Sequence, residues 1–213
     1  MNTKQATKQQ KNHWTNYTEM KGCLNILILL AVFSCTKEGA GTAYTSIDAG
    51  QTQGESIYYT DRIPDDSVLF VAPSTYRQFG FDINRDQISD LTITANLSAG
   101  MGSHSYLFSA AAVTEGIQFC TISPDAAIAD TLQKNSCIDR NCTWYDSTAV
   151  LSSYVSTMQQ GSHQAGCWNN CGEKYIGFRL CTHTDTLYGW IRAEIRNLTT
   201  LYIRDYAYKM PKH

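Results

Sequence analysis

The stretch that most constrains the fold of this chain is residues 81–97. In its first half, side chains that carry oxygen stand at alternate positions, and in its second half apolar and polar residues alternate strictly. A period of two over 91–97 is typical of a half-buried β-strand. Oxygen ligands packed as densely as those before it suit a hard cation such as calcium. The sequence therefore predicts a calcium-pinned loop that leads into a β-sheet.

The loop 82–90 offers five oxygen ligands at alternate positions. They are the side chains of Asp82, Asn84, Asp86 and Asp90 and the main-chain carbonyl of Ile88. The loop is not an EF-hand, because Ile93 stands where a bidentate glutamate is needed and a strand, not a helix, follows. It resembles the calcium loops of FG-GAP-type and other β-hairpin calcium repeats, which implies a structural calcium ion as cofactor. The alternative is an ordinary polar turn between two strands.

Residues 20–35 have the layout of an export signal. Lys21 precedes an apolar run at 23–33, and this run is shorter than the about 20 residues that a membrane-spanning helix needs. The run ends in Val-Phe-Ser-Cys at 32–35, which resembles a bacterial lipoprotein signal. The resemblance implies that Cys35 is acylated and becomes the new N-terminus. A plain secretory signal and a buried helix are the alternatives, and either Met1 or Met20 could be the start.

This layout predicts three segments and a location. We expect a leader and lipoprotein signal over 1–35, a flexible tether of small and polar residues over 36–54, and a single domain over 55–213. The protein would be exported and anchored by lipid to a bacterial outer membrane or cell surface. Beyond residue 35 there are 13 basic and 18 acidic residues, a net charge of −5. This mildly acidic body argues against nucleic acid as a partner.

Six cysteines remain beyond the proposed signal, and in an exported protein an even number favours disulfides. They are Cys120, Cys137, Cys142, Cys167, Cys171 and Cys181. Short loops favour the pairs 137/142 and 167/171, which leaves 120 with 181, although six cysteines allow many connectivities. A zinc site is the alternative, but these cysteines lack the C-x-x-C spacing that zinc sites usually show.

The body reads as an all-β domain, since tyrosine and threonine are abundant and only 17% of the residues are charged. Strands are expected at 56–60, 68–71, 91–97, 106–113, 116–122, 175–180, 187–196 and 201–209. A turn is expected at 64–66. The region from about 124 to 172 lacks a clear pattern, apart from a short helix expected near 125–132. We predict an antiparallel β-sandwich, jelly-roll-like, with this region as a Cys-rich irregular insertion.

The C-terminal strands carry a second resemblance. The sequences YIGFRL, LYGWIR and DYAY, at 175–180, 187–192 and 205–208, together with the acidic loop, resemble secreted bacterial (Bacteroidetes-type) lipoproteins of unknown function. That resemblance implies fold and location rather than an activity. Four residues are candidates for ligand binding: Trp168, Tyr188, Trp190 and Arg192. Tyr188, Trp190 and Arg192, together with Tyr206 and Tyr208, form either an aromatic platform for sugar rings or a packed aromatic ladder with arginine across it. Trp168 would join Trp190 in a carbohydrate-binding module.

No catalytic motif is recognisable in the sequence. It lacks G-x-S-x-G, H-E-x-x-H, a P-loop and G-x-G-x-x-G. We therefore expect a calcium-stabilised binding or structural module of the cell envelope, whose partner is a glycan or another envelope protein. A hydrolase of surface polysaccharide, with two carboxylates as acid and base, and a carbohydrate-binding module are the alternatives.

Overall fold

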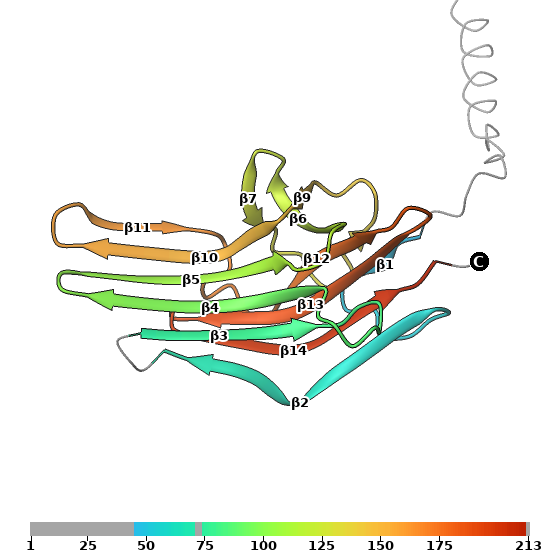
Figure 1. Cartoon of the computed structure of the whole chain (residues 1–213), viewed down its shortest axis with the longest axis horizontal. Helices are drawn as coiled ribbons and strands as arrows, with labels where there is room; N and C mark the ends of the chain where they lie inside the picture. The colour runs from blue at the N-terminus through green and yellow to red at the C-terminus, as the bar shows by residue number, and fades with distance from the viewer. Residues whose placement is uncertain (1–44, 71–73, 212–213) are drawn as a thin grey trace, which may run out of the picture. The chain divides into compact units, whose positions relative to one another are not determined.

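The computed structural model describes residues 45–70 and 74–211, and all regular structure in these ranges is β (Figure 1). The all-β fold is therefore confirmed. The predicted leader and lipoprotein signal, with Cys35, lie outside the described residues. The first seven strands are β1 (Ile47–Asp48), β2 (Ile57–Leu69), β3 (Ser74–Phe81), β4 (Leu91–Gly100), β5 (Ser103–Ala112), β6 (Ile117–Ser123) and β7 (Ala126–Ala129). The others are β8 (Cys137–Ile138), β9 (Trp144–Asp146), β10 (Thr148–Thr157), β11 (Gly161–Ala165), β12 (Lys174–Cys181), β13 (Thr186–Arg196) and β14 (Thr200–Lys209).

Twelve of these strands form one sheet that folds over into a sandwich. Its order is β2-β14-β13-β12-β6-β7-β10-β5-β4-β3, with β11 beside β10 and β9 beside β6. The end strands β2 and β3 come close enough for a side-chain contact. Arg62 in β2 donates from Nη2 to the carbonyl of Gly80 in β3 at 2.8 Å. Among the named strands the pairing is antiparallel, apart from one parallel residue pair between β7 and β10. The sheet is thus nearly closed, and the predicted sandwich is confirmed.

The main core lies between the two layers of this sandwich. One layer contributes Phe81, Leu91, Ile93 and Phe108, and the other contributes the apolar faces of β12, β13 and β14. The ring of Phe81 meets that of Tyr206 edge-on across the layers, at 5.2 Å between centroids. The core face of β4 is the alternating set predicted from 91–97, since Leu91, Ile93, Ala95 and Leu97 are all buried.

The C-terminal meander follows directly from the sequence. β12 pairs with β13 and β13 with β14, both antiparallel, so three consecutive strands lie side by side as predicted. The turn between β13 and β14 falls at the expected place, with Asn197 and Leu198 both at positive φ. Asparagine tolerates that conformation better than most residues, which favours a tight turn at this point.

The turn predicted at 64–66 is wrong, because β2 continues through it. The register against β14 shifts there, so that Asp66 lies opposite Ile203 while Asp61 lies opposite Asp205. Proline has no N–H to give to a ladder, and within sheets it is confined to edges and bulges. β2 is an edge strand, so Pro64 produces a wide bulge and a bend in place of a chain reversal.

The region 124–172 is less irregular than predicted. β10 pairs along its length with β5, and the hairpin that it forms with β11 extends the sheet. The helix expected near 125–132 is wrong: β7 occupies that stretch and pairs with β6. Irregular chain with short strands remains at 130–147 and 166–173, and this part holds four of the six cysteines of the body.

Part of the predicted tether belongs to the folded body. β1 pairs with β8, and Ile47 and Ala49 are fully buried. They cover the outer face of β12 and β13, where they form a second, smaller core with Ile138, Tyr188 and Trp190. The body therefore begins no later than residue 45, about ten residues before the predicted boundary, and the meander is buried on both faces.

Candidate functional site

The acidic loop 82–90 connects β3 to β4 and is organised around Asp90. This side chain is 1% exposed. Its Oδ2 accepts hydrogen bonds from the main-chain N–H groups of Ile83 at 2.7 Å and Asn84 at 3.0 Å. Its own main-chain carbonyl accepts the N–H groups of Val113 and Thr114. Asp90 therefore holds the start of the loop and the end of β5 in place at once.

The other acidic side chains close the loop by local hydrogen bonds. Asp82 accepts from the N–H groups of Arg85 at 2.6 Å and Gln87 at 2.9 Å, and Asp86 accepts from Ile88 at 2.8 Å. Arg85 and Gln87 adopt positive φ values of 67° and 72°. The carboxylates satisfy N–H groups that these two left-handed residues turn inward, so the loop forms without a glycine at either position.

Arg85 fastens the loop to the opposite layer of the sandwich. Its guanidinium lies 4.0 Å from the centre of the Tyr58 ring, and its Nε donates to the hydroxyl of Tyr208 at 3.0 Å. The two tyrosine rings stack at 5.4 Å. Burial is the main reason that the pKa of Tyr208 is raised, and Arg85 opposes that shift. The loop is thus held at Asp90, next to β4, and at Arg85, near its middle.

The fit of these residues to a cation is partial. In the described part of the chain, no three acidic, histidine or cysteine side chains converge as a metal-binding group. Two carboxylates do point at one place: Nδ2 of Asn84 donates to Asp86 at 3.1 Å and to Asp90 at 3.2 Å. A carboxylate oxygen has lone pairs beyond those it uses in a hydrogen bond. A cation at the position of that NH₂ group would meet both carboxylates.

Three of the four predicted ligand-binding residues are buried. Trp168 is 0% exposed and Trp190 1%, and Tyr188 packs beside Trp190 in the second core. Their rings offer no open face for a sugar. Tyr188 and Trp190 fit the packed ladder, whereas Trp168 lies apart from them in the main core. Arg192 instead forms a double hydrogen bond with the buried carboxylate of Asp205, at 2.9 and 2.6 Å.

Asp205 also accepts the hydroxyl of Tyr59 at 2.9 Å. Desolvation and this hydrogen bond together raise the pKa of Tyr59 to about 12. Arg192 reaches Glu173 as well, and Arg204 joins Glu173 to Glu194. This group of charges links β13 and β14 to the segment before β12.

The six cysteines of the body are all free thiols in this structure. The pairs 137/142, 167/171 and 120/181 predicted from spacing are not formed. Cys120 is buried in β6. Cys181 is the last residue of β12, where it accepts a hydrogen bond from Thr186 at 3.9 Å. The thiol of Cys171 donates to the carbonyl of Trp168.

A group of rings that no pattern in the sequence indicated lies on β5 and β10. His104, Tyr106 and Tyr154 contact one another, with all three centroid distances between 5.8 and 5.9 Å. We call these three residues the ring cluster. Tyr106 lies opposite both Leu97 and Tyr154 in the sheet and packs against the core beside Phe70.

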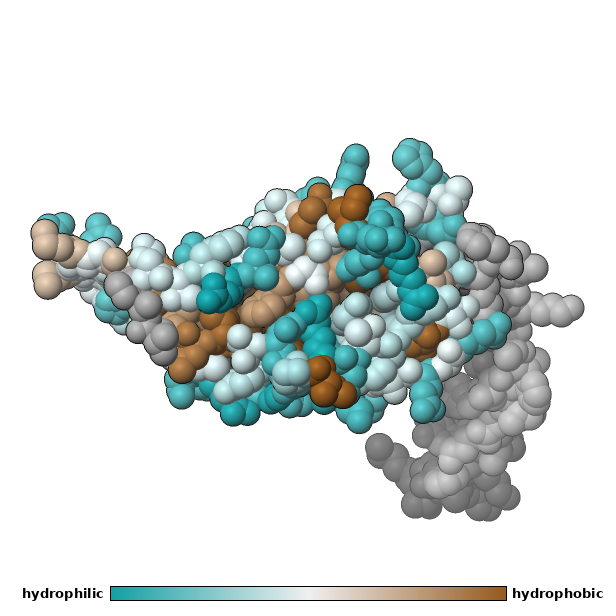
Figure 2. Space-filling view, turned by 60° about the horizontal axis from the view of Figure 1, so that its bottom comes forward, coloured by the Kyte–Doolittle hydropathy of each residue, from teal (hydrophilic) through white to brown (hydrophobic). Residues whose placement is uncertain are grey.

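The ring cluster stands where one layer of the sandwich projects. The hairpins β4–β5 and β10–β11 extend past the turn between β13 and β14 (Figure 1). At their tips Met101 and Met158 are almost fully exposed. Figure 2 shows that the visible face is mostly hydrophilic, with hydrophobic residues gathered in patches. The projecting end therefore combines aromatic and apolar groups that are only partly buried.

In the described ranges, no helix has the length and apolar character needed to cross a membrane. No protein-family model, curated protein or solved structure matches the chain. The resemblances to calcium loops and to bacterial lipoproteins therefore stay predictions.

Proposed function

We propose that this protein is an exported, lipid-anchored protein of the bacterial cell envelope whose β-sandwich acts as a binding module for a glycan. The apolar run 23–33 before Cys35 supports the anchor. The ring cluster supports the binding function. Its rings are held in one group by two paired strands, and sites on strands hold their side chains more rigidly than sites on loops.

The ring cluster has the features of a sugar-binding surface. Aromatic rings present apolar faces to the C–H groups of a sugar ring, while His104 and the two tyrosine hydroxyls supply hydrogen-bonding groups. Ser156 of β10, which lies opposite His104 in the sheet, stands on the same face as these rings. The combination suits a ligand that has apolar faces and hydroxyl edges, as a pyranose has.

A structural calcium ion in the loop 82–90 belongs to the same proposal. Asp86 and Asp90 would supply carboxylate oxygens, with Asp82, Asn84 and the carbonyl of Ile88 as the other oxygen donors. The ion would stiffen the connection between β3 and β4. It would not take part in a reaction.

The anchor is tested by metabolic labelling with a palmitate analogue during expression in a bacterium. The full chain is expected to take up the label and to partition into detergent, and Cys35→Ser is expected to lose both properties. Cys23→Ser, in the same apolar run, is the matched control and keeps them. Label that persists in Cys35→Ser would overturn the anchor.

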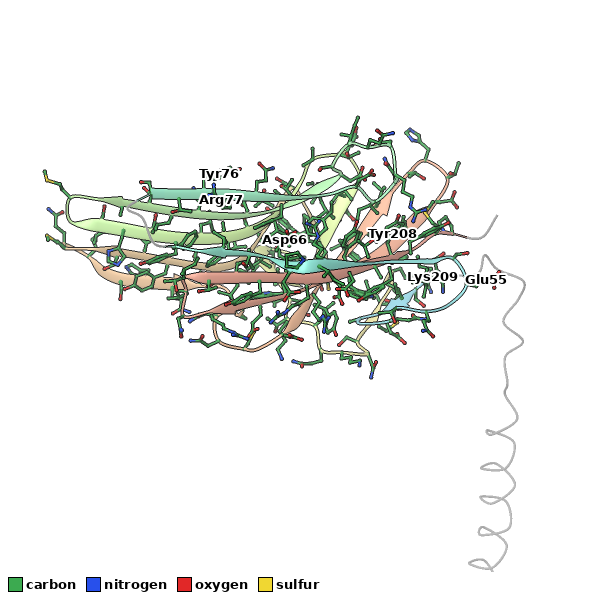
Figure 3. The ribbon with its side chains drawn as sticks, turned by 90° about the horizontal axis from the view of Figure 1, so that it is seen from below. Glu55, Asp66, Tyr76, Arg77, Tyr208 and Lys209 are labelled. Carbon is green, nitrogen blue, oxygen red and sulfur yellow. The ribbon has the colours of Figure 1, made fainter. Side chains whose placement is uncertain are left out.

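The binding function is tested with a panel of soluble polysaccharides by titration calorimetry. We expect saturable binding that Tyr154→Ala weakens about tenfold or more, since a lost contact of about 1.4 kcal/mol is a factor of ten. Tyr76→Ala is the control, because Tyr76 is an exposed tyrosine on the strand β3 (Figure 3). Tyr76 lies opposite Asn96, which in turn lies opposite Leu107, so its side chain is on the other face of the sheet from Tyr106. Equal affinities of the two variants, or no saturable binding across the panel, would contradict a glycan site at this position.

A further inference from the structure

Two of the six thiols in the body meet, although neither spacing nor order in the sequence pairs them. Cys120 lies in β6, and β9 runs antiparallel beside it, with Trp144 opposite Cys120. The N–H of Thr121 donates to the carbonyl of Thr143 at 2.8 Å, which continues the pairing by one step. Cys142 precedes Trp144 by two residues, so its side chain stands on the same face of this ladder as that of Cys120, as its diagonal neighbour. The two thiols are close enough to influence each other's pKa, and the Cys142 thiol also donates to the carbonyl of Cys137 at 3.7 Å.

The surroundings hold both sulfur atoms in place. Cys120 is 4% exposed, and its Cβ lies against the backbone of Gly177, where an added methyl group would come within 3.1 Å of it. Cys142 is half-buried and packs against the second core. The indole of Trp144 donates to the carbonyl of Asp139 at 3.1 Å, which closes the turn that contains Cys142.

The two thiols differ in pKa and in exposure, and this difference decides which of them reacts first with an external disulfide. The neighbouring Cys120 thiol lowers the pKa of Cys142, which favours the thiolate at Cys142 over the thiolate at Cys120. The Cys142 thiol, together with burial, raises the pKa of Cys120. Cys142 is also the more exposed of the two, so it is the thiol that an external disulfide meets first.

We propose that Cys120 and Cys142 form an intramolecular disulfide by exchange with a small-molecule disulfide. The Cys142 thiolate attacks one sulfur of that molecule, which breaks its S–S bond and releases one thiolate. Cys120, after losing its proton to solvent, then attacks the Cys142 sulfur of the mixed disulfide and releases the second thiolate. The protein loses two electrons and two protons, and the small disulfide becomes two thiols.

This bond would close the segment 120–142, which contains β7 and β8. Because β8 pairs with β1, the bond would also fix the strand pair that covers the outer face of the meander. The strand register brings Cys142 beside Cys120, whereas its contact with Cys137 is to the main-chain carbonyl and not to the thiol. The pairing leaves Cys181 with its Thr186 partner. The pairing depends only on the fold of the described body, so it holds whether or not the chain is exported.

The test uses the reduced full-length protein and oxidised glutathione. After exposure at pH 8, remaining thiols are blocked with iodoacetamide, and the unfolded protein is cut with trypsin. Cleavage after Lys134 and Arg140 separates Cys120, Cys137 and Cys142 onto three peptides. We expect the peptide that ends at Lys134 to be linked to the peptide that begins at Asn141. The latter also holds Cys167 and Cys171, so Cys142→Ser must abolish the link, while Cys181→Ser, the matched control, must keep it.

Two further readouts distinguish a true pair from chance proximity. Cys120→Ser is expected to accumulate a glutathione adduct on Cys142, because the thiol that resolves the mixed disulfide is gone. The oxidised wild type is expected to melt about 5 to 10 °C above the reduced protein. The proposal is overturned if Cys120 stays alkylatable after oxidation and unfolding, or if Cys142 is recovered linked to Cys137.

Discussion

Replacing Asp90 with alanine is expected to lower the free energy of unfolding by about 3 kcal/mol. The carboxylate is buried, and it is the acceptor for the N–H groups of Ile83 and Asn84. Alanine would leave these two donors without their acceptor, and each unsatisfied buried group costs about 1 to 3 kcal/mol. Denaturant unfolding followed by tryptophan fluorescence measures the loss, with the slope of the transition as a check that the folded state stays compact.

Asp86→Ala is the matched comparison, because Asp86 is an exposed carboxylate in the same loop. It is expected to cost about 0.5 kcal/mol without calcium, as surface substitutions do. Its effect should appear when calcium is added. If the loop binds calcium with a dissociation constant of about 0.1–1 mM, 10 mM calcium stabilises the wild type by about 1.4 to 2.7 kcal/mol, and Asp86→Ala removes that gain.

These two variants separate the architecture of the loop from its metal. A large loss in Asp90→Ala with no calcium effect on the wild type would mean that hydrogen bonds alone hold the loop, and that 82–90 is a polar turn. A loss in Asp86→Ala as large as that in Asp90→Ala, measured with EDTA present, would mean that Asp90 is not the residue around which the loop is organised.

The sequence pattern predicted those strands whose own residues alternate between apolar and polar. β4 and β12 to β14 alternate clearly, and the strands of the meander are joined by short turns, so side-by-side pairing follows from proximity in the chain. The loop 82–90 was also predicted from local sequence, because its internal hydrogen bonds join residues at most seven positions apart.

What the pattern missed depends on distant segments. The outer face of β13 carries Tyr188 and Trp190, and nothing in the sequence pattern indicated that β1 and Ile138 cover it. β10 is rich in serine, and its weak alternation hides a strand that β5 and β11 stabilise from both sides. The ring cluster and the Cys120–Cys142 contact both join residues that only the sheet brings together. Single-sequence periodicity contains no information on such pairs.

Trp168 illustrates how burial reverses an interpretation based on residue type. An aromatic residue in a loop rich in asparagine and cysteine suggested a ligand contact. In the structure Trp168 is fully buried in the main core, and its Nε1 donates to the carbonyl of Ala129 at 3.3 Å. The residues after it are tied to the meander, since Asn170 donates to the carbonyl of Ile195 and Asn169 accepts from the N–H of Leu198.

Trp168→Ala is therefore expected to lower the free energy of unfolding by about 4 kcal/mol, more than any other substitution considered above. The lost ring leaves a cavity between the layers, and the carbonyl of Ala129 loses its donor. Trp168→Phe is the control: it keeps most of the apolar contact and should cost clearly less. Denaturant unfolding of both variants gives the comparison. If Trp168→Ala instead weakened glycan binding while its stability stayed within about 0.5 kcal/mol of the wild type, the side chain would be a surface ligand contact and the packing of this loop onto the meander would be wrong.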